Sequence, residues 1–86
     1  MVYFTKHAEE KFKVLERHGL GITREKVVET VESPELVDIV SREPLCIAQG
    51  TLDDTHVLRV VYDQQDEDRV VITFYPGRRK KYGTDR

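Results

Sequence analysis

The chain has 86 residues, 38% of them hydrophobic and 35% charged, and its formal net charge is −2. This composition predicts a single folded domain over residues 1–86 and argues against disorder and against a strongly basic nucleic-acid coat. One cysteine, Cys46, excludes an internal disulfide framework and a cysteine-based zinc site. No apolar run approaches the roughly 18 residues that span a bilayer, and the chain starts without a signal peptide's apolar stretch. We therefore expect a cytoplasmic protein without a membrane contact.

Two helices are predicted in the first half of the chain. The first follows the capping residue Thr5, ends before Gly19, and carries apolar residues at helical spacing, namely Ala8, Phe12 and Leu15. The second follows Thr23, ends at Ser33 before a proline, and has a buried side formed by Val27, Val28 and Val31.

The rest of the chain predicts strands. The expected strands are 36–40, 45–49, 56–62 and 69–75, after a short apolar start at 1–4 that can form another. Polar residues predict a turn at 41–44, a turn at 50–55 and a loop at 63–68, and Pro76-Gly77 is predicted to end the last strand. Helices ahead of a strand meander predict an α+β fold, with two helices on one face of a four-stranded antiparallel sheet.

Alternation of side chains predicts which side of the two strongest strands is buried. On the last strand, the wholly apolar set predicted to pack under the helices is Val70, Ile72 and Phe74. On the strand before it, Arg59 lies between Val57 and Val61 on the opposite, mixed side. We expect that mixed side to be the open face of the sheet.

The last ten residues form a predicted basic tail, 77–86, with five cationic residues and one acidic residue. The cations lie between two aromatic residues, and the whole group is Tyr75, Arg78, Arg79, Lys80, Lys81 and Tyr82. Phosphates attract cations and unstacked bases stack on flat side chains, so this group is typical of RNA binding. The alternative is a solvated tail that aids solubility or masks a sheet edge.

Several other polar residues also have both a functional and a structural interpretation. Arg59 can hold a phosphate and stabilise charge in a transition state, or it can form a structural pair with an acidic residue. His7 and Lys11 share a polar stripe of the first helix, which suits proton transfer but is also what any amphipathic helix presents. His56 opens a strand and is predicted to be a structural or a sheet-edge residue. No histidine pair has metal-ligand spacing and no phosphate loop or dinucleotide fingerprint occurs, so we expect no metal and no cofactor.

Three segments together resemble a known family. They are FTKHAEEKF at 4–12, GITREKV at 21–27 with a proline after it, and LRVVY at 58–62 followed by VVITFY at 70–75. The pattern is similar to that of small prokaryotic proteins grouped as domain of unknown function 4258, and through them to the RelE/ParE-like toxin superfamily with its BrnT branch. A longer spacer at 15–20 departs from that pattern. The resemblance implies two helices on a small antiparallel sheet and an mRNA endonuclease, ribosome-dependent or free, that an antitoxin protein keeps inactive.

The chemistry implied by this resemblance needs no metal. The RNA 2′-OH attacks the adjacent phosphate, a base takes its proton, cations stabilise the charge and an acid protonates the leaving oxygen. The implied proton-transfer residues are His7 or Lys11. The implied charge stabilisers are Arg59 with Arg78 or Arg79, and the stacking group is Tyr75 or Tyr82.

A non-catalytic module that binds protein or nucleic acid through the same face is the alternative function. The near-neutral net charge and the lack of a tight acid–base pair favour it. Geometry distinguishes the two functions, because the enzyme needs His7 or Lys11 near Arg59 and the tail. If these groups point to opposite faces of the sheet, the binding module is favoured.

Overall fold

The computed structural model describes residues 1–39 and 45–82, so Val40, the predicted turn at 41–44 and the tail residues 83–86 lie outside the described residues. The elements in chain order are β1 (Val2–Phe4), α1 (Lys6–Arg17), α2 (Arg24–Glu32), β2 (Leu36–Ile39), β3 (Leu45–Thr51), β4 (His56–Gln65), β5 (Asp68–Arg78) and α3 (Arg79–Tyr82). Within this part of the chain, no helix is both long enough and apolar enough to cross a membrane.

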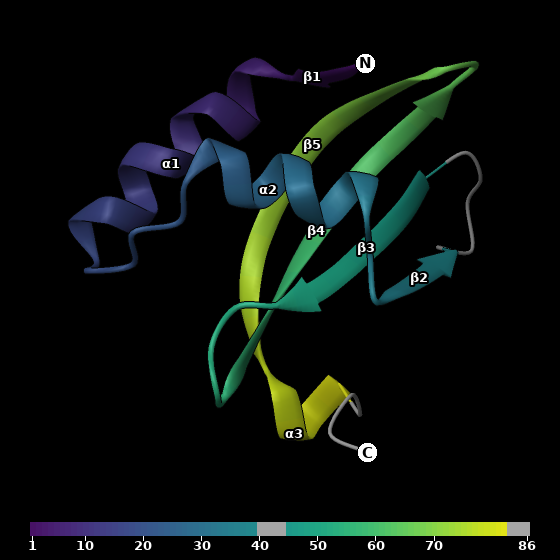
Figure 1. The fold of residues 1–86 in the computed structure, drawn as a ribbon. Helices are drawn as coiled ribbons and strands as arrows, with labels where there is room; N and C mark the ends of the chain where they lie inside the picture. The colour runs from purple at the N-terminus through teal and green to yellow at the C-terminus, as the bar shows by residue number, and fades with distance from the viewer. Residues whose placement is uncertain (40–44, 83–86) are drawn as a thin grey trace.

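The strands form one sheet in the order β1-β5-β4-β3-β2. The strands β2 to β5 are antiparallel neighbours, as predicted, whereas β1 pairs parallel to β5 with Phe4 opposite Val71. The sheet is therefore five-stranded and mixed, because the apolar start of the chain covers part of the outer edge of β5, whose backbone groups would otherwise lack partners. Figure 1 shows α1 and α2 side by side on one face of this α+β fold.

Both predicted helices begin at their predicted caps. The Thr5 hydroxyl accepts a hydrogen bond from the Ala8 N–H at 3.2 Å, and the Thr23 hydroxyl accepts one from the Lys26 N–H at 3.1 Å. After α1 the chain turns through Gly19, whose φ of 79° is costly for residues with a side chain. The α2 helix ends before Ser33, as the following proline predicts.

The two central strands are longer than predicted. The expected loop at 63–68 is a tight turn at Asp66 and Glu67, with Asp66 at a φ of 56°, and the strands continue on both sides of it. The β5 strand also runs through Pro76 to Arg78. Among the described residues, β1 pairs only with residues 69–71 of β5, so the outer edge of β5 is uncovered at Pro76. Proline, which has no backbone N–H, is tolerated at such an edge.

The core lies between the helices and the sheet. On β4 the core residues are Leu58, Val60 and Tyr62. On β5 the predicted Phe74 is fully buried, but its companion is Val71, whereas the predicted Val70 and Ile72 are half-buried. A β-bulge at Ile72 shifts the alternation by one residue. Thr5 fixes this bulge, because its N–H donates to the Val71 carbonyl at 3.0 Å and its hydroxyl to the Ile72 carbonyl at 3.2 Å. The buried core cluster consists of Ala8, Leu15, Ile22, Val27, Val31, Ala48, Leu58, Val60, Tyr62, Val71 and Phe74.

Candidate functional site

Arg59 lies in the middle of β4 on the face away from α1 and α2. Its neighbours across the ladder are Gln49 on β3 and Tyr75 on β5. The guanidinium donates through Nε to the Tyr75 hydroxyl at 3.2 Å, through Nη1 to Gln49 Oε1, and through Nη2 to Asp38 Oδ2 at 3.1 Å. The predicted side of the sheet is right, but this face is not open at Arg59, whose side chain is only 8% exposed.

The contacts of Arg59 hold its charge inside the sheet face. Burial works against the charge, but hydrogen bonds to Tyr75 and Asp38 outweigh it, so the guanidinium pKa lies above its ordinary value. Gln49 is fully buried, and its Nε2 has no hydrogen-bond partner within the described part of the chain. A phosphate would have to displace Asp38 or Gln49 to reach Arg59, so the arrangement corresponds to the structural ion pair that the sequence left open.

His7 and Lys11 lie on α1, which packs against β5 and β1 on the helix-covered face. Arg59 belongs to the opposite face, with the sheet between them. The structure therefore does not bring either predicted proton-transfer residue together with Arg59. This is the arrangement that favours a binding module.

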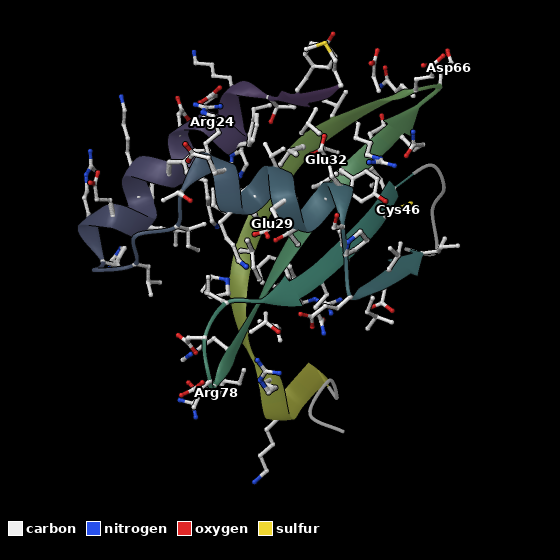
Figure 2. All side chains as sticks on the ribbon, in the orientation of Figure 1. Arg24, Glu29, Glu32, Cys46, Asp66 and Arg78 are labelled. Atoms are coloured by element: carbon white, nitrogen blue, oxygen red, sulfur yellow. The ribbon has the colours of Figure 1, made fainter. Side chains whose placement is uncertain are left out.

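Three predicted cationic residues do gather at one end of the sheet, beside the turn that joins β3 to β4. We call Arg78, Arg79 and Lys80 the cationic end. Figure 2 shows Arg78 at this tip, remote from Glu29 and Glu32 on α2. Gly77 and Arg78 continue β5, and Lys81 and Tyr82 complete α3, so this part of the predicted tail has regular secondary structure.

The turn and the cationic end are joined by Arg79. Its N–H donates to the Thr55 carbonyl at 2.9 Å, and its Nη2 donates to the Asp53 carbonyl at 3.0 Å. Between them lies a surface hollow of about 380 Å³, lined by Asp54, Thr55, Arg78, Arg79 and Lys80. A hollow of this size is within the range of small-ligand sites.

Tyr75, the predicted stacking residue, is half-buried and accepts the hydrogen bond from Arg59 Nε on the face away from the helices. Arg78, three residues later, lies directly opposite His56 on β4. Since alternate residues of a strand point to opposite faces, Arg78 points to the other side of the sheet from Tyr75. Arg59 and Tyr75 thus form one cluster and the cationic end another.

Sequence reasoning missed the acid–base group beside the cationic end. His56 Nδ1 lies 3.1 Å from Asp53 Oδ1 and 2.8 Å from Thr55 Oγ1. The hydrogen bond from the Thr55 N–H, followed by those from His56, lowers the pKa of the Asp53 carboxyl below its ordinary value. The signal in the sequence is an aspartate two residues before a threonine and three before a histidine, a spacing at which a short turn brings all three together.

A second hollow has the opposite charge. It measures about 390 Å³, lies along α2, and is lined by Arg24, Glu25, Val28, Glu29, Glu32 and Ser33. Its one guanidinium is already paired, because Arg24 Nη1 donates to Glu9 Oε2 at 3.0 Å. Three carboxylates around this hollow disfavour an anion. Within residues 1–39 and 45–82, no group of three or more His, Cys, Asp or Glu side chains gathers as a metal site would require.

Comparison of the chain with protein-family models, curated proteins and solved structures finds no match. Its function is therefore inferred from the geometry of its own residues.

Proposed function

We propose that this chain is a small RNA-binding domain that holds the phosphates of single-stranded RNA at the cationic end. The supporting observation is that Arg78, Arg79 and Lys80 line one surface hollow in a chain whose net charge is −2. Cations that converge on one place of an otherwise acidic surface raise the local concentration of a polyanion there. Phosphate contacts of this kind give affinity with little sequence preference.

The distribution of charge supports one orientation of the RNA. The hollow along α2 carries Glu25, Glu29 and Glu32 and disfavours phosphates. The hollow at the cationic end carries three cations and the single carboxylate of Asp54. A bound strand is therefore expected to cross the end of the sheet at the β3–β4 turn and to avoid the helix-covered side.

The geometry favours RNA binding over RNA cleavage. The residues predicted to transfer protons in cleavage, His7 and Lys11, lie on the helix-covered face, away from Arg59. Proton transfer needs the acid or base within hydrogen-bond reach of the reacting oxygen. The binding module is therefore the function that this geometry supports best.

The test is the affinity for a short, fluorescently labelled single-stranded RNA, measured by anisotropy at low salt. The variant Arg78→Gln/Lys80→Gln is expected to bind about tenfold more weakly, because it loses phosphate contacts. The matched control is Lys6→Gln/Lys13→Gln, which removes the same charge from exposed positions of α1. Equal losses in both variants, or an unmodified chain that does not bind RNA, would contradict the proposal.

The finer proposal, based on the sequence resemblance, is that the domain belongs with the RelE/ParE-like toxins. In that case its RNA target is bound alone or on the ribosome, and its partner is an antitoxin protein. Two helices on one face of a largely antiparallel sheet support this relation. Growth after induced expression tests it: arrest that Arg78→Gln/Lys80→Gln relieves is expected, and normal growth with soluble protein would contradict it.

The strand β2 supports a protein partner as a second function. It lies at the end of the sheet, and Leu36, Val37 and Ile39 are 39%, 43% and 68% exposed. An apolar strand at a sheet edge can be extended by a strand from another chain. The variant Val37→Lys/Ile39→Lys is expected to lose a partner that co-purifies with the unmodified chain, and retention of that partner would exclude this surface.

A further inference from the structure

We propose that the hollow at the cationic end binds a phosphate monoester, the doubly charged group of a mononucleotide or of a phosphorylated RNA terminus, in preference to the singly charged phosphodiester inside an RNA strand. The inference rests on the proposed function in one respect, since both assign a phosphate to the cationic end. It adds the chemical form of that phosphate, which follows from the charges around the hollow.

The cations around the hollow have no carboxylate partners. In the part of the chain that the structure describes, no carboxylate lies within ion-pair distance of Arg78, Arg79 or Lys80. By contrast, Arg24 on α2 is paired with Glu9. The positive charge at the cationic end is therefore not neutralised by the described residues, and an anion can supply the missing partner.

The charges that line the hollow leave an excess of two positive charges. The three cationic side chains are opposed there by one carboxylate, that of Asp54. The neighbouring Asp53 lines a different hollow, and its carboxylate accepts hydrogen bonds from the N–H groups of Thr55 and His56. A phosphate monoester carries about −1.5 to −2 charges at neutral pH, whereas each phosphodiester carries about −1. The monoester therefore neutralises the excess more completely than the diester does.

The size of the hollow suits one phosphate group rather than a run of them. Its volume is about 380 Å³, which is near the lower end of the range of small-ligand pockets, about 300 to 1,000 Å³. Arg78, Arg79 and Lys80 are consecutive residues where β5 passes into α3. Since all three line this one hollow, they can act on the same phosphate.

Arg79 is the cation that the fold holds in place. Its N–H donates to the Thr55 carbonyl at 2.9 Å, and its Nη2 donates to the Asp53 carbonyl at 3.0 Å. Among the described residues, its Nη1 has no hydrogen-bond partner. A guanidinium that is already held loses little side-chain entropy when it binds a phosphate oxygen. Arg78 and Lys80 are exposed and supply the remaining positive charge.

The first experiment compares two small probes that differ in the form of the phosphate. Adenosine 5′-monophosphate is a monoester, and adenosine 3′,5′-cyclic monophosphate is a diester with the same base and sugar. Titration into the ¹⁵N-labelled chain at low salt is expected to give a dissociation constant about tenfold lower for the monoester, with the largest shift changes at 54–55 and 78–80. Equal constants for the two probes would overturn the inference.

Two variants at exposed positions change the charge of the hollow in opposite directions. Lys80→Gln removes a positive charge and is expected to weaken monoester binding about fivefold. Asp54→Asn removes the carboxylate and is expected to strengthen it about threefold, a gain that a merely structural role of Asp54 would not give. The matched control Lys6→Gln, at an exposed position of α1, is expected to bind normally. Unchanged affinity in both hollow variants would contradict the proposed site.

The second experiment distinguishes a free mononucleotide from an RNA terminus. One single-stranded RNA is prepared with a phosphate on its 5′ end, on its 3′ end or on neither. If a terminal phosphate tightens binding about tenfold, the site takes that terminus. Equal affinities of the three RNAs, with the monoester preferred among the small probes, assign the site to a free mononucleotide.

The failures of the inference and of the proposed function are distinguishable. RNA binding without a preference for a terminal phosphate, together with equal binding of the small probes, would overturn the inference and leave the proposed function standing. Binding of the mononucleotide without binding of RNA would refute the proposed function and support the inference. Binding of neither would refute both.

Discussion

Replacement of Arg59 by methionine separates a structural role from a phosphate contact. The change keeps an apolar stem over the sheet and removes the guanidinium. Its hydrogen bonds to Gln49, Asp38 and Tyr75 are lost. Asp38 and Tyr75 are not buried and regain water, whereas the Gln49 amide is fully buried and is left without its donor.

The size of the effect follows from these differences in exposure. A buried polar group that loses its partner costs about 1 to 3 kcal/mol, and a hydrogen bond to a charged group contributes about 1.5 to 3 kcal/mol. Since the half-exposed partners are partly compensated by water, we expect Arg59→Met to lower the free energy of unfolding by about 3 kcal/mol. For a small domain that unfolds with a slope of about 1 kcal/mol per molar urea, the midpoint falls by about 3 M.

Urea unfolding followed by circular dichroism measures this loss. Arg17→Met is the matched control, because Arg17 is exposed in the last turn of α1 and its replacement is expected to cost less than about 0.5 kcal/mol. RNA affinity is measured on the same samples below their unfolding midpoints. If Arg59→Met kept its midpoint and lost its affinity for RNA, the structural role would be refuted and Arg59 would be a phosphate-binding residue.

Three further changes test the fold and its pH dependence. Phe74→Ala empties the centre of the core and is expected to cost about 4 kcal/mol in urea unfolding, with less than 2 kcal/mol contradicting its central position. Thr5→Ala removes the α1 cap and the bond to the Ile72 carbonyl and is expected to cost about 2 kcal/mol, whereas Thr5→Ser should restore most of it. The hydrogen bond from Arg24 lowers the pKa of Glu9 in the folded chain, so the stabilisation it gives is present at neutral pH and is lost as the pH falls through that lowered pKa. Thermal unfolding between about pH 7 and pH 3 should therefore depend less on pH in Glu9→Gln than in the unmodified chain, and parallel curves would contradict this.

Local signals in the sequence were sufficient for the helices. Thr5 and Thr23 cap the two helices as predicted, because capping depends on a hydroxyl and an N–H three residues apart. The four antiparallel strands were also predicted, since β-branched and aromatic runs bounded by polar residues are a local pattern. The sequence did not decide whether the apolar start of the chain forms a strand, because the pairing of β1 with β5 joins residues 67 positions apart.

The features that could not be predicted from the sequence depend on contacts between residues far apart in the chain. The bulge at Ile72 depends on the residue that caps α1, so strict alternation was right for Phe74 but wrong for Val70 and Ile72. The ion pair of Arg59 depends on Asp38, which belongs to the edge strand β2 and lies beyond β3. Neither Thr5, which binds the bulge at Ile72, nor Asp38, which pairs with Arg59, can be inferred from the neighbouring residues in the sequence.

The candidate site shows the same division. Arg78, Arg79 and Lys80 were predicted from a contiguous run, and the fold gathers them around one hollow. The contacts of His56 with Asp53 and Arg78 could not be predicted from the sequence, because they depend on the shape of a turn and on the pairing of β4 with β5.

A nuclear magnetic resonance titration of the ¹⁵N-labelled chain with a short single-stranded RNA tests the central claim most directly. The backbone amides of 54–55 and 78–80, which line the hollow at the cationic end, are expected to show the largest shift changes, and those of α2 the smallest. Largest changes on α2 or along β2, or no changes at a large excess of RNA, would contradict RNA binding at the cationic end.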